Sequence, residues 1–270
     1  MNLHDALEIA LLSDTGVVRT RNEDAVFADA ELGLAILADG MGGYKAGEVA
    51  SGMATTLLAT SFNRFLNAFR RGEEVLGDPV QRINDEICAA NLAIFNAAQS
   101  QPQYAGMGTT LVFAWFIDNR MYLAHVGDSR VYRWRDGDLE QLTKDHSFLQ
   151  EQIDSGMISV EAARYSANKN LVTRALGVDA SVDVDIAEHA TRRGDLLLFC
   201  SDGLNDMLED GEIAGILHLY GTTPALAAEH LVDRANQNGG RDNVSVILIQ
   251  VRGEYAVPSG WWQKLLARLK

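Results

Sequence analysis

Short apolar runs that stop at Gly or Asp-Gly punctuate this chain and predict β-strands that end in tight turns. Two pairs of runs are separated only by short polar turns, Asp118-Asn119-Arg120 and Arg135-Asp136-Gly137-Asp138. Each pair is therefore predicted to form a β-hairpin, and consecutive hairpins indicate antiparallel sheets. The predicted strands are residues 34–38, 110–117, 121–126, 131–134, 139–142, 196–200 and 244–251.

Two helices are predicted between the first strand and the first hairpin. Apolar residues recur every three or four positions, which predicts two long helices with one buried stripe each. A third helix is predicted to begin at Thr223-Pro224 and to stop at Asn238-Gly239-Gly240. Helices that are segregated from hairpins predict an α+β fold rather than a parallel sheet of βαβ units. The two expected stripes are Val49, Met53, Leu57, Phe65 and Phe69, and Val80, Ile83, Ile87, Ala90 and Ile94.

The composition indicates one folded domain. The chain has 270 residues, 47% of them apolar, and no low-complexity linker divides it. We expect a domain over residues 1–253 and a separate tail over 254–270. A net charge of -14 opposes contact with nucleic acid and anionic membranes. Two distant cysteines, no signal peptide and no long apolar run predict a cytoplasmic protein.

Five short acidic motifs carry the candidate chemistry. Each alone is most simply a turn, because Asp-Gly is a common way to leave a strand. However, three of the aspartates follow an apolar run and a fourth precedes one, so strand ends can bring four carboxylates together. Carboxylates without a His/Cys cluster suit magnesium or manganese and not zinc. The motifs are Arg19-Thr20-Arg21-Asn22-Glu23-Asp24, Asp39-Gly40-Met41-Gly42-Gly43, Gly127-Asp128-Ser129-Arg130, Ser201-Asp202-Gly203 and Arg241-Asp242-Asn243.

In this order, the motifs resemble those of the metal-dependent protein phosphatases of the 2C type, especially the small single-domain bacterial members. The resemblance spans nearly the whole chain and includes Met107-Gly108-Thr109-Thr110, Asp145-His146-Ser147 and the segment 170–177. It implies a β-sandwich of two antiparallel sheets flanked by helix pairs, in α-β-β-α layers. It also implies a flap subdomain at about residues 146–177.

The resemblance further implies a binuclear centre of Mn²⁺ or Mg²⁺. Asp39 is expected to bridge the two cations, and Gly40 to offer its carbonyl oxygen to one of them. Asp202 and Asp242 are expected to bind the other. These three aspartates are then catalytic through metal-bound water, since two cations about 3.5–4 Å apart can present a shared water as hydroxide.

Four more residues receive roles from the resemblance. Glu23 and Asp24 are expected to act through metal-bound waters, and Asp128, with Asp202, to form a weaker third-metal site. Arg19 is expected to grip the substrate phosphate, for which its planar fork of donors is suited. The expected reaction is hydrolysis of phosphoserine and phosphothreonine on proteins, opposing a cognate kinase in bacterial signalling. We expect the protein to act as a monomer.

Several alternatives stay open. Met41 stands where many animal relatives have a histidine acid, so the acid is either another metal-bound water, which we favour, or His146. A structural role for His146 and packing for His125 are the simpler interpretations. The chain could also be an inert phosphoprotein-binding relative, or act on small phosphate esters or phosphoarginine. The basic amphipathic tail, Trp261 to Lys270, suits a docked helix, a partner-docking segment or a membrane-interface anchor.

Overall fold

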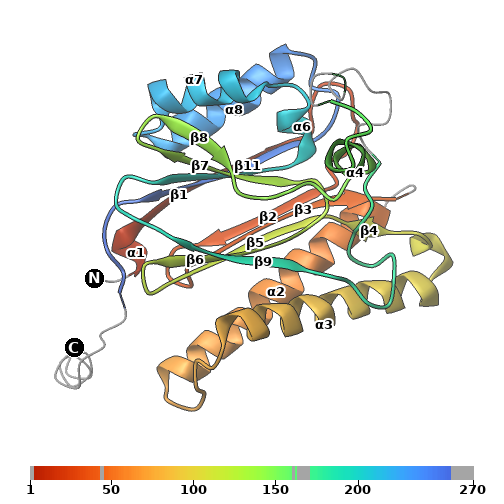
Figure 1. The fold of residues 1–270 in the computed structure, drawn as a ribbon. Coiled ribbons are helices and arrows are strands. Elements are labelled where there is room, and N and C mark those ends of the chain that lie inside the picture. Colours follow the sequence, from red (N-terminus) through yellow and green to blue (C-terminus); the bar gives the residue numbers. More distant parts are fainter. Residues whose placement is uncertain (1–2, 43–45, 160–161, 163–170, 257–270) are drawn as a thin grey trace.

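The computed structural model describes residues 3–42, 46–159, 162 and 171–256. Two antiparallel sheets pack face to face, and a pair of helices covers the outer face of each (Figure 1). This confirms the predicted α+β sandwich in α-β-β-α layers. Within the described ranges, no helix has both the length and the apolar character needed to cross a bilayer. The predicted tail from residue 257 onward lies outside the described residues.

One sheet has the order β1-β11-β10-β7-β8. Its central strand β10 is apolar along its whole length because both faces are covered, so alternate residues enter different cores. In β10, Leu197 and Phe199 face the other sheet, whereas Leu196 and Leu198 face the helices. The strands are β1 (Leu7–Asp14), β7 (Arg130–Arg135), β8 (Asp138–Gln141), β10 (Leu196–Cys200) and β11 (Val244–Val251).

The other sheet has the order β2-β3-β5-β6-β9, with β4 paired to β3. Its central hairpin turns through Asp118 and Asn119, which both have positive φ, as does Asp136 in the β7–β8 turn. Both predicted hairpins are confirmed. The strands are β2 (Asp24–Asp29), β3 (Leu34–Met41), β4 (Gly108–Thr109), β5 (Leu111–Ile117), β6 (Arg120–Val126) and β9 (Asp185–Ala190).

The helices follow the predicted order, with short additions. Pro79 and Pro224 occupy first-turn positions, and the Asp78 side chain caps α3 by accepting from Val80 N–H. The Thr223 side chain makes no capping hydrogen bond. The helices are α1 (Leu3–Ala6), α2 (Ala46–Arg70), α3 (Pro79–Ser100), η1 (Pro102–Tyr104), α4 (Phe148–Asp154), α6 (Asp202–Asn205), α7 (Asp210–Tyr220) and α8 (Pro224–Gln237).

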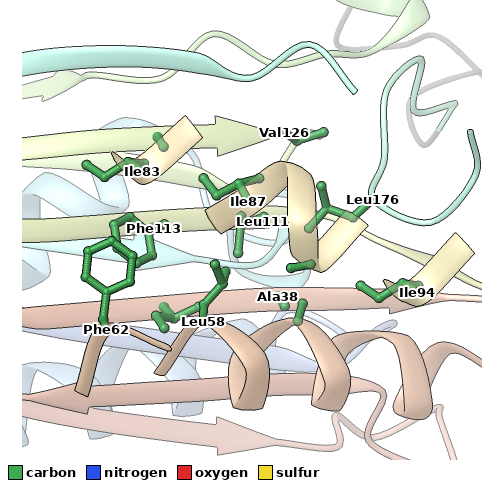
Figure 2. Close-up of a cluster of buried hydrophobic side chains, with 14 of the residues drawn as sticks. Ala38, Leu58, Phe62, Ile83, Ile87, Ile94, Leu111, Phe113, Val126 and Leu176 are labelled. Atoms are coloured by element: carbon green, nitrogen blue, oxygen red, sulfur yellow. The ribbon is translucent and has the colours of Figure 1, made fainter. Parts of the chain in front are cut away.

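Helices α2 and α3 bury their stripes against β3, β5 and β6 (Figure 2). The predicted α3 stripe is confirmed from Ile83 to Ile94, although Val80 is exposed. The predicted α2 stripe is confirmed only in part: Phe65 is buried and Val49 and Met53 pack half-buried against the core, whereas Leu57 and Phe69 are exposed. The other buried apolar positions of α2 are Ala46, Ala50, Ala54, Leu58, Phe62 and Leu66. The small side chains of Ala50 and Ala54 let the backbone of α2 pack closely on the sheet. A pattern that follows only the larger apolar side chains therefore misplaces the buried face of this helix.

Candidate metal centre and phosphate site

A cluster of aspartates forms where strands of both sheets end. Asp24, the first residue of β2, pairs in register with Asp39 near the end of β3. Asp202, the first residue of α6, lies two residues after β10, and Asp242 lies two residues before β11, the neighbour of β10. The turn between β6 and β7 contributes Asp128. The fold therefore brings together the carboxylates that strand-end reasoning singled out.

The electrostatics of the cluster favour a cation. Burial raises the pKa of Asp39 well above its usual range, and the charges of Asp24, Asp202, Asp128 and Asp242 raise it further. Burial is also the main cause of the raised pKa of Asp202, and it raises the pKa of Asp24 to about 6. Like charges held together in this way are stabilised by a bound cation, which removes their mutual repulsion.

Two orphaned oxygen atoms test whether these residues fit metal ions. Asp24 Oδ1 and Asp202 Oδ1 are buried and make no hydrogen bond, although buried polar atoms nearly always have a partner. The second oxygen of Asp24 is satisfied, because Ser201 Oγ donates to Asp24 Oδ2 over 2.8 Å. Carboxylate oxygens with open lone pairs are the ligands that magnesium and manganese prefer. The residues therefore fit divalent cations.

Close backbone approach explains two glycines of the cluster. A Cβ atom at Gly40 would lie 2.2 Å from the carbonyl oxygen of Gly47 and 2.6 Å from that of Glu23. A Cβ atom at Gly203 would lie 2.0 Å from the carbonyl oxygen of Asn243. Gly40 N–H also donates to the Glu23 carbonyl over 3.1 Å. Since only glycine fits in such space, both positions keep the segments that carry Glu23, Asp39 and Asp202 tightly joined.

Threonine hydroxyls hold the backbone of Asp39. Asp39 N–H donates to Thr110 Oγ1 over 3.0 Å, and Thr109 Oγ1 donates to the Asp39 carbonyl over 2.8 Å. Thr110 Oγ1 also lies 2.7 Å from Ser129 Oγ, next to Asp128. Thr110 therefore links the backbone of Asp39 to the turn that carries Asp128. The sequence motif Met107-Gly108-Thr109-Thr110 did not predict a role for Thr110, because the sequence of a strand start does not indicate which residue its threonine will bond.

Asn243 fastens the N-terminal loop to the cluster. It is 5% exposed, and its Oδ1 accepts from Glu23 N–H over 2.8 Å. Its Nδ2 donates to the carbonyl oxygens of Thr15 and Arg21, over 2.9 and 2.8 Å. One buried side chain thus satisfies three backbone groups on the segment that contains Arg19. The sequence motif included Asn243 without indicating this role.

Arg19 lies at the open side of the cluster. Its side chain is 52% exposed, and Nη2 donates to Asp242 Oδ2 over 2.6 Å. Glu23 and Asp39 also raise the pKa of Arg19, although its hydrogen bond with Asp242 is the largest cause. A half-exposed guanidinium beside buried carboxylates can meet an anion that arrives from solvent while the acidic cluster stays covered.

Asp128 lies on the Asp202 side of the cluster. It is 7% exposed, and burial, followed by the charge of Asp145, raises its pKa to about 6. Among charged neighbours, Asp128 contributes most to the raised pKa of Asp202. Met41 ends β3 and pairs with Gly108, and its thioether has no group that could donate a proton.

His125, His146 and Asp185 form a second group, whose possible ligand atoms all lie within 4.8 Å of one another. Among the described residues, no other His, Cys or carboxylate set is so compact. A binuclear centre does not need such a spacing, because different carboxylates bind different ions and some act through water. The flap prediction is only partly covered, since residues 160–161 and 163–170 lie outside the described residues.

Comparison with known proteins gives consistent matches. Residues 17–238 match the family described as Protein phosphatase 2C. The chain is 40% identical over 245 residues to the serine/threonine protein phosphatase PstP of Mycobacterium tuberculosis, covering 91% of this chain and 45% of that protein. It therefore spans about half the length of this relative. It is 38% identical over 244 residues to the serine/threonine phosphatase stp of Listeria innocua, covering 88% of this chain and 93% of that protein.

Solved structures agree with these matches. A crystal structure of the M. tuberculosis phosphatase PstP superposes with a TM-score of 0.83 at 39% identity, covering 92% of this chain and 99% of that chain. A structure of the PstP catalytic domain in complex with two manganese ions superposes with a TM-score of 0.80 at the same identity and coverage.

Proposed function

The chain belongs to the protein phosphatase 2C family, and from this premise we propose that it hydrolyses phosphoserine and phosphothreonine on proteins in a metal-dependent reaction. The observation that carries the proposal is the buried aspartate cluster, with open oxygens on Asp24 and Asp202, beside the half-exposed Arg19. Carboxylates whose pKa is raised by burial and by neighbouring charges are typical of functional sites.

We assign the cations to the residues as follows. Asp39 bridges two ions, the carbonyl oxygen of Gly40 binds one, and Asp202 and Asp242 bind the other. The manganese complex of the mycobacterial relative supports two ions of manganese or magnesium. Glu23 and Asp24 act through water. Asp128, together with Asp202, is proposed to hold a weaker third ion, and the strong effect of its charge on Asp202 supports this pairing.

The cations, when bound, supply a water of lowered pKa and neutralise charge on the phosphoryl oxygens. The remaining work belongs to the chain. Arg19 binds the outer oxygens of the phosphate and orients it toward the aspartate cluster. Thr110 and Asn243 keep Asp39 and Glu23 in place by their hydrogen bonds. These contacts preorganise the site, so that little reorganisation is needed during the reaction.

The proton for the leaving alkoxide is proposed to come from water. Met41 cannot donate one, and both nitrogens of His146 are engaged, with Gly127 N–H and with Asp185. This favours the structural interpretation of His146 over its use as the general acid.

The proposal extends to the setting of the reaction. We propose phosphorylated proteins and a cognate kinase as partners, and a monomeric, cytoplasmic enzyme that functions in bacterial signalling. Free Cys88 and Cys200 are compatible with a reducing compartment. Contact with a membrane is proposed only through the tail.

A panel of phosphorylated substrates tests the proposed function. With added Mn²⁺, phosphate release should be fastest from phosphoserine and phosphothreonine peptides. Higher kcat/KM on small phosphate esters or phosphoarginine peptides would contradict the protein substrate class. Tight binding of phosphopeptides without any phosphate release would instead identify an inert binding protein.

A further inference from the structure

The turn that carries Asp128 is hydrogen-bonded at both ends to the segment Asp145-His146-Ser147. Gly127 N–H donates to His146 Nδ1 over 3.1 Å, and His146 N–H donates to the Gly127 carbonyl over 2.9 Å. The guanidinium of Arg130, on the far side of Asp128, makes a bidentate contact with Asp145 at 2.7–3.0 Å. Both ends of the turn are thus fixed to adjacent residues of one segment.

The Nε2 edge of the His146 ring faces β9, and the His146 backbone bonds the segment that contains Thr173 and Arg174. His146 Nε2 lies 3.2 Å from Asp185 Oδ2 at the start of β9, and Arg174 Nη1 lies 3.2 Å from the other oxygen of Asp185. The His146 carbonyl accepts from Thr173 N–H over 2.8 Å. His146 therefore connects the Asp128 turn to residues 173–174, where the chain leaves the proposed flap.

These contacts define the tautomer of the ring. Nδ1 accepts from a backbone N–H, so the proton must be on Nε2, which donates to Asp185. His146 is 7% exposed, and its ring stacks on that of His125 at a centroid distance of 4.7 Å and an interplanar angle of 22°. Buried, stacked and bonded at both nitrogens, the ring has one orientation.

The same group is a poor cation site. Nearly parallel imidazole rings cannot both direct their in-plane lone pairs at one ion. The guanidinium of Arg174 already neutralises Asp185 and lies 3.5 Å from His146 Nε2. The group formed by His125, His146, Asp185 and Arg174 is therefore best described as a structural hydrogen-bond network.

We propose that His146 is the positioning residue for Asp128, acting through the Gly127 N–H, and that it couples the placement of this carboxylate to residues 173–174. The effect on turnover rests on the proposed function, whereas the effect on the turn does not. Gly127 has a φ of +106°, a conformation that glycine adopts readily, but the same conformational freedom lets it adopt many others, so the hydrogen bonds with His146 restrict the turn to one shape.

Two isosteric variants separate the two edges of the ring. In His146→Asn, the side-chain oxygen takes the place of Nδ1 and can still accept from Gly127. In His146→Gln, the side-chain amide takes the place of Nε2 and can reach Asp185 but not Gly127. His125→Gln is the control, because it removes the stacked ring and leaves both contacts of His146.

Amide hydrogen exchange of Gly127 in EDTA-treated protein is the direct readout. Exchange should be about tenfold faster in His146→Gln than in wild type, and near wild type in His146→Asn and His125→Gln, since the hydrogen bond of the Gly127 N–H is lost only in His146→Gln. With Mn²⁺ and a phosphothreonine peptide, His146→Gln should lose turnover in the wild-type background but not in the Asp128→Ala background.

Equal exchange of Gly127 in the Asn and Gln variants would overturn the proposal. An equal loss of turnover with and without Asp128 would also overturn it. If no variant and no wild-type protein releases phosphate, the proposed function fails, while the exchange result still decides whether His146 holds the turn.

Discussion

Arg19 and Asp242, which are 223 positions apart in the sequence, form an ion pair with Nη2 2.6 Å from Oδ2. Asp242 Oδ1 accepts from Asn243 N–H over 2.9 Å, so both carboxylate oxygens are oriented by the chain. The proposed phosphate-binding residue is therefore also a counter-ion of a proposed metal ligand. Its exposed position makes the ion pair itself a weak contributor to stability.

Replacing Arg19 with Ala should raise KM for peptide and aryl phosphates alike and lower kcat about tenfold or less. Loss of a charge-assisted bidentate contact lowers kcat/KM roughly ten- to a hundredfold. Arg19→Lys, which keeps the charge but not the planar fork, should recover only part of this loss. Calorimetry should show Mn²⁺ affinity that is not weakened in Arg19→Ala, because the repulsive cation is gone. Weakened Mn²⁺ binding would show that Arg19 serves mainly to orient Asp242.

Asp128→Ala should keep the fold and the binding of two cations while reducing turnover. Asp128 is assigned to the accessory third site, so the defect should persist at saturating Mn²⁺ for the main centre. Steady-state rates across a Mn²⁺ titration measure this, with the exposed Asp233→Ala as the matched control. Unchanged turnover at every Mn²⁺ concentration would remove Asp128 from the reaction.

The stability of EDTA-treated protein should depend on pH through the buried aspartates of the cluster, of which Asp24 and Asp128 titrate in the most accessible range. Burial raises the pKa of each to about 6, compared with about 3.9 for an exposed aspartate. Because the folded state binds these protons more tightly, the contribution to the free energy of unfolding is complete below about pH 4 and is lost as pH rises through about 6.

Thermal unfolding between pH 4 and 7.5 measures this contribution. Asp24→Asn should flatten the dependence, since an amide does not titrate. Added Mn²⁺ should raise Tm more at pH 7.5 than at pH 5, because protons and cations compete for the same oxygens. A larger Mn²⁺ effect at pH 5 would contradict a cation site built from this aspartate cluster.

Asn243→Ala should destabilise the fold by about 3 kcal/mol, since it removes a buried side chain that bonds three partly buried backbone groups. It should also lower activity, because the segment with Arg19 and Glu23 loses its anchor. Chemical denaturation measures the loss. Asn238→Ala, which removes exposed hydrogen bonds to the Met207 carbonyl and to Glu212, should cost less than about 1 kcal/mol. Similar decreases in the free energy of unfolding for both variants would show that Asn243 does not anchor the N-terminal loop.

Local signals in the sequence predicted much of the fold. The turns at Asp118-Asn119 and Asp136-Gly137 specify their hairpins by residue type, and β10 and β11 are apolar along their lengths. Strands β1, β2 and β9 were not predicted. Each is only partly buried, and β9 is an edge strand with mostly exposed residues, so the apolar pattern that marks a strand is weak. Their structure depends on partners far away in the sequence.

The candidate site shows the same division. Strand-end placement predicted that Asp39, Asp128, Asp202 and Asp242 would meet. It could not predict that Ser201 would bond Asp24, or that Thr110 would link Asp39 to Ser129, because these contacts join segments 19 to 177 residues apart. Hydroxyl and amide side chains have many possible partners, and only the packed fold selects one.

Phosphate release from a phosphothreonine peptide, before and after Mn²⁺ is restored to EDTA-treated protein, tests the central claim most directly. Wild type and the surface control Asp233→Asn should be inactive in EDTA and recover fully with Mn²⁺. Asp39→Asn, which removes the charge of the proposed bridging ligand, should stay inactive at every Mn²⁺ concentration and show weakened Mn²⁺ binding by calorimetry. Full wild-type turnover in excess EDTA, or near-normal turnover of Asp39→Asn, would contradict a metal-dependent phosphatase centred on Asp39.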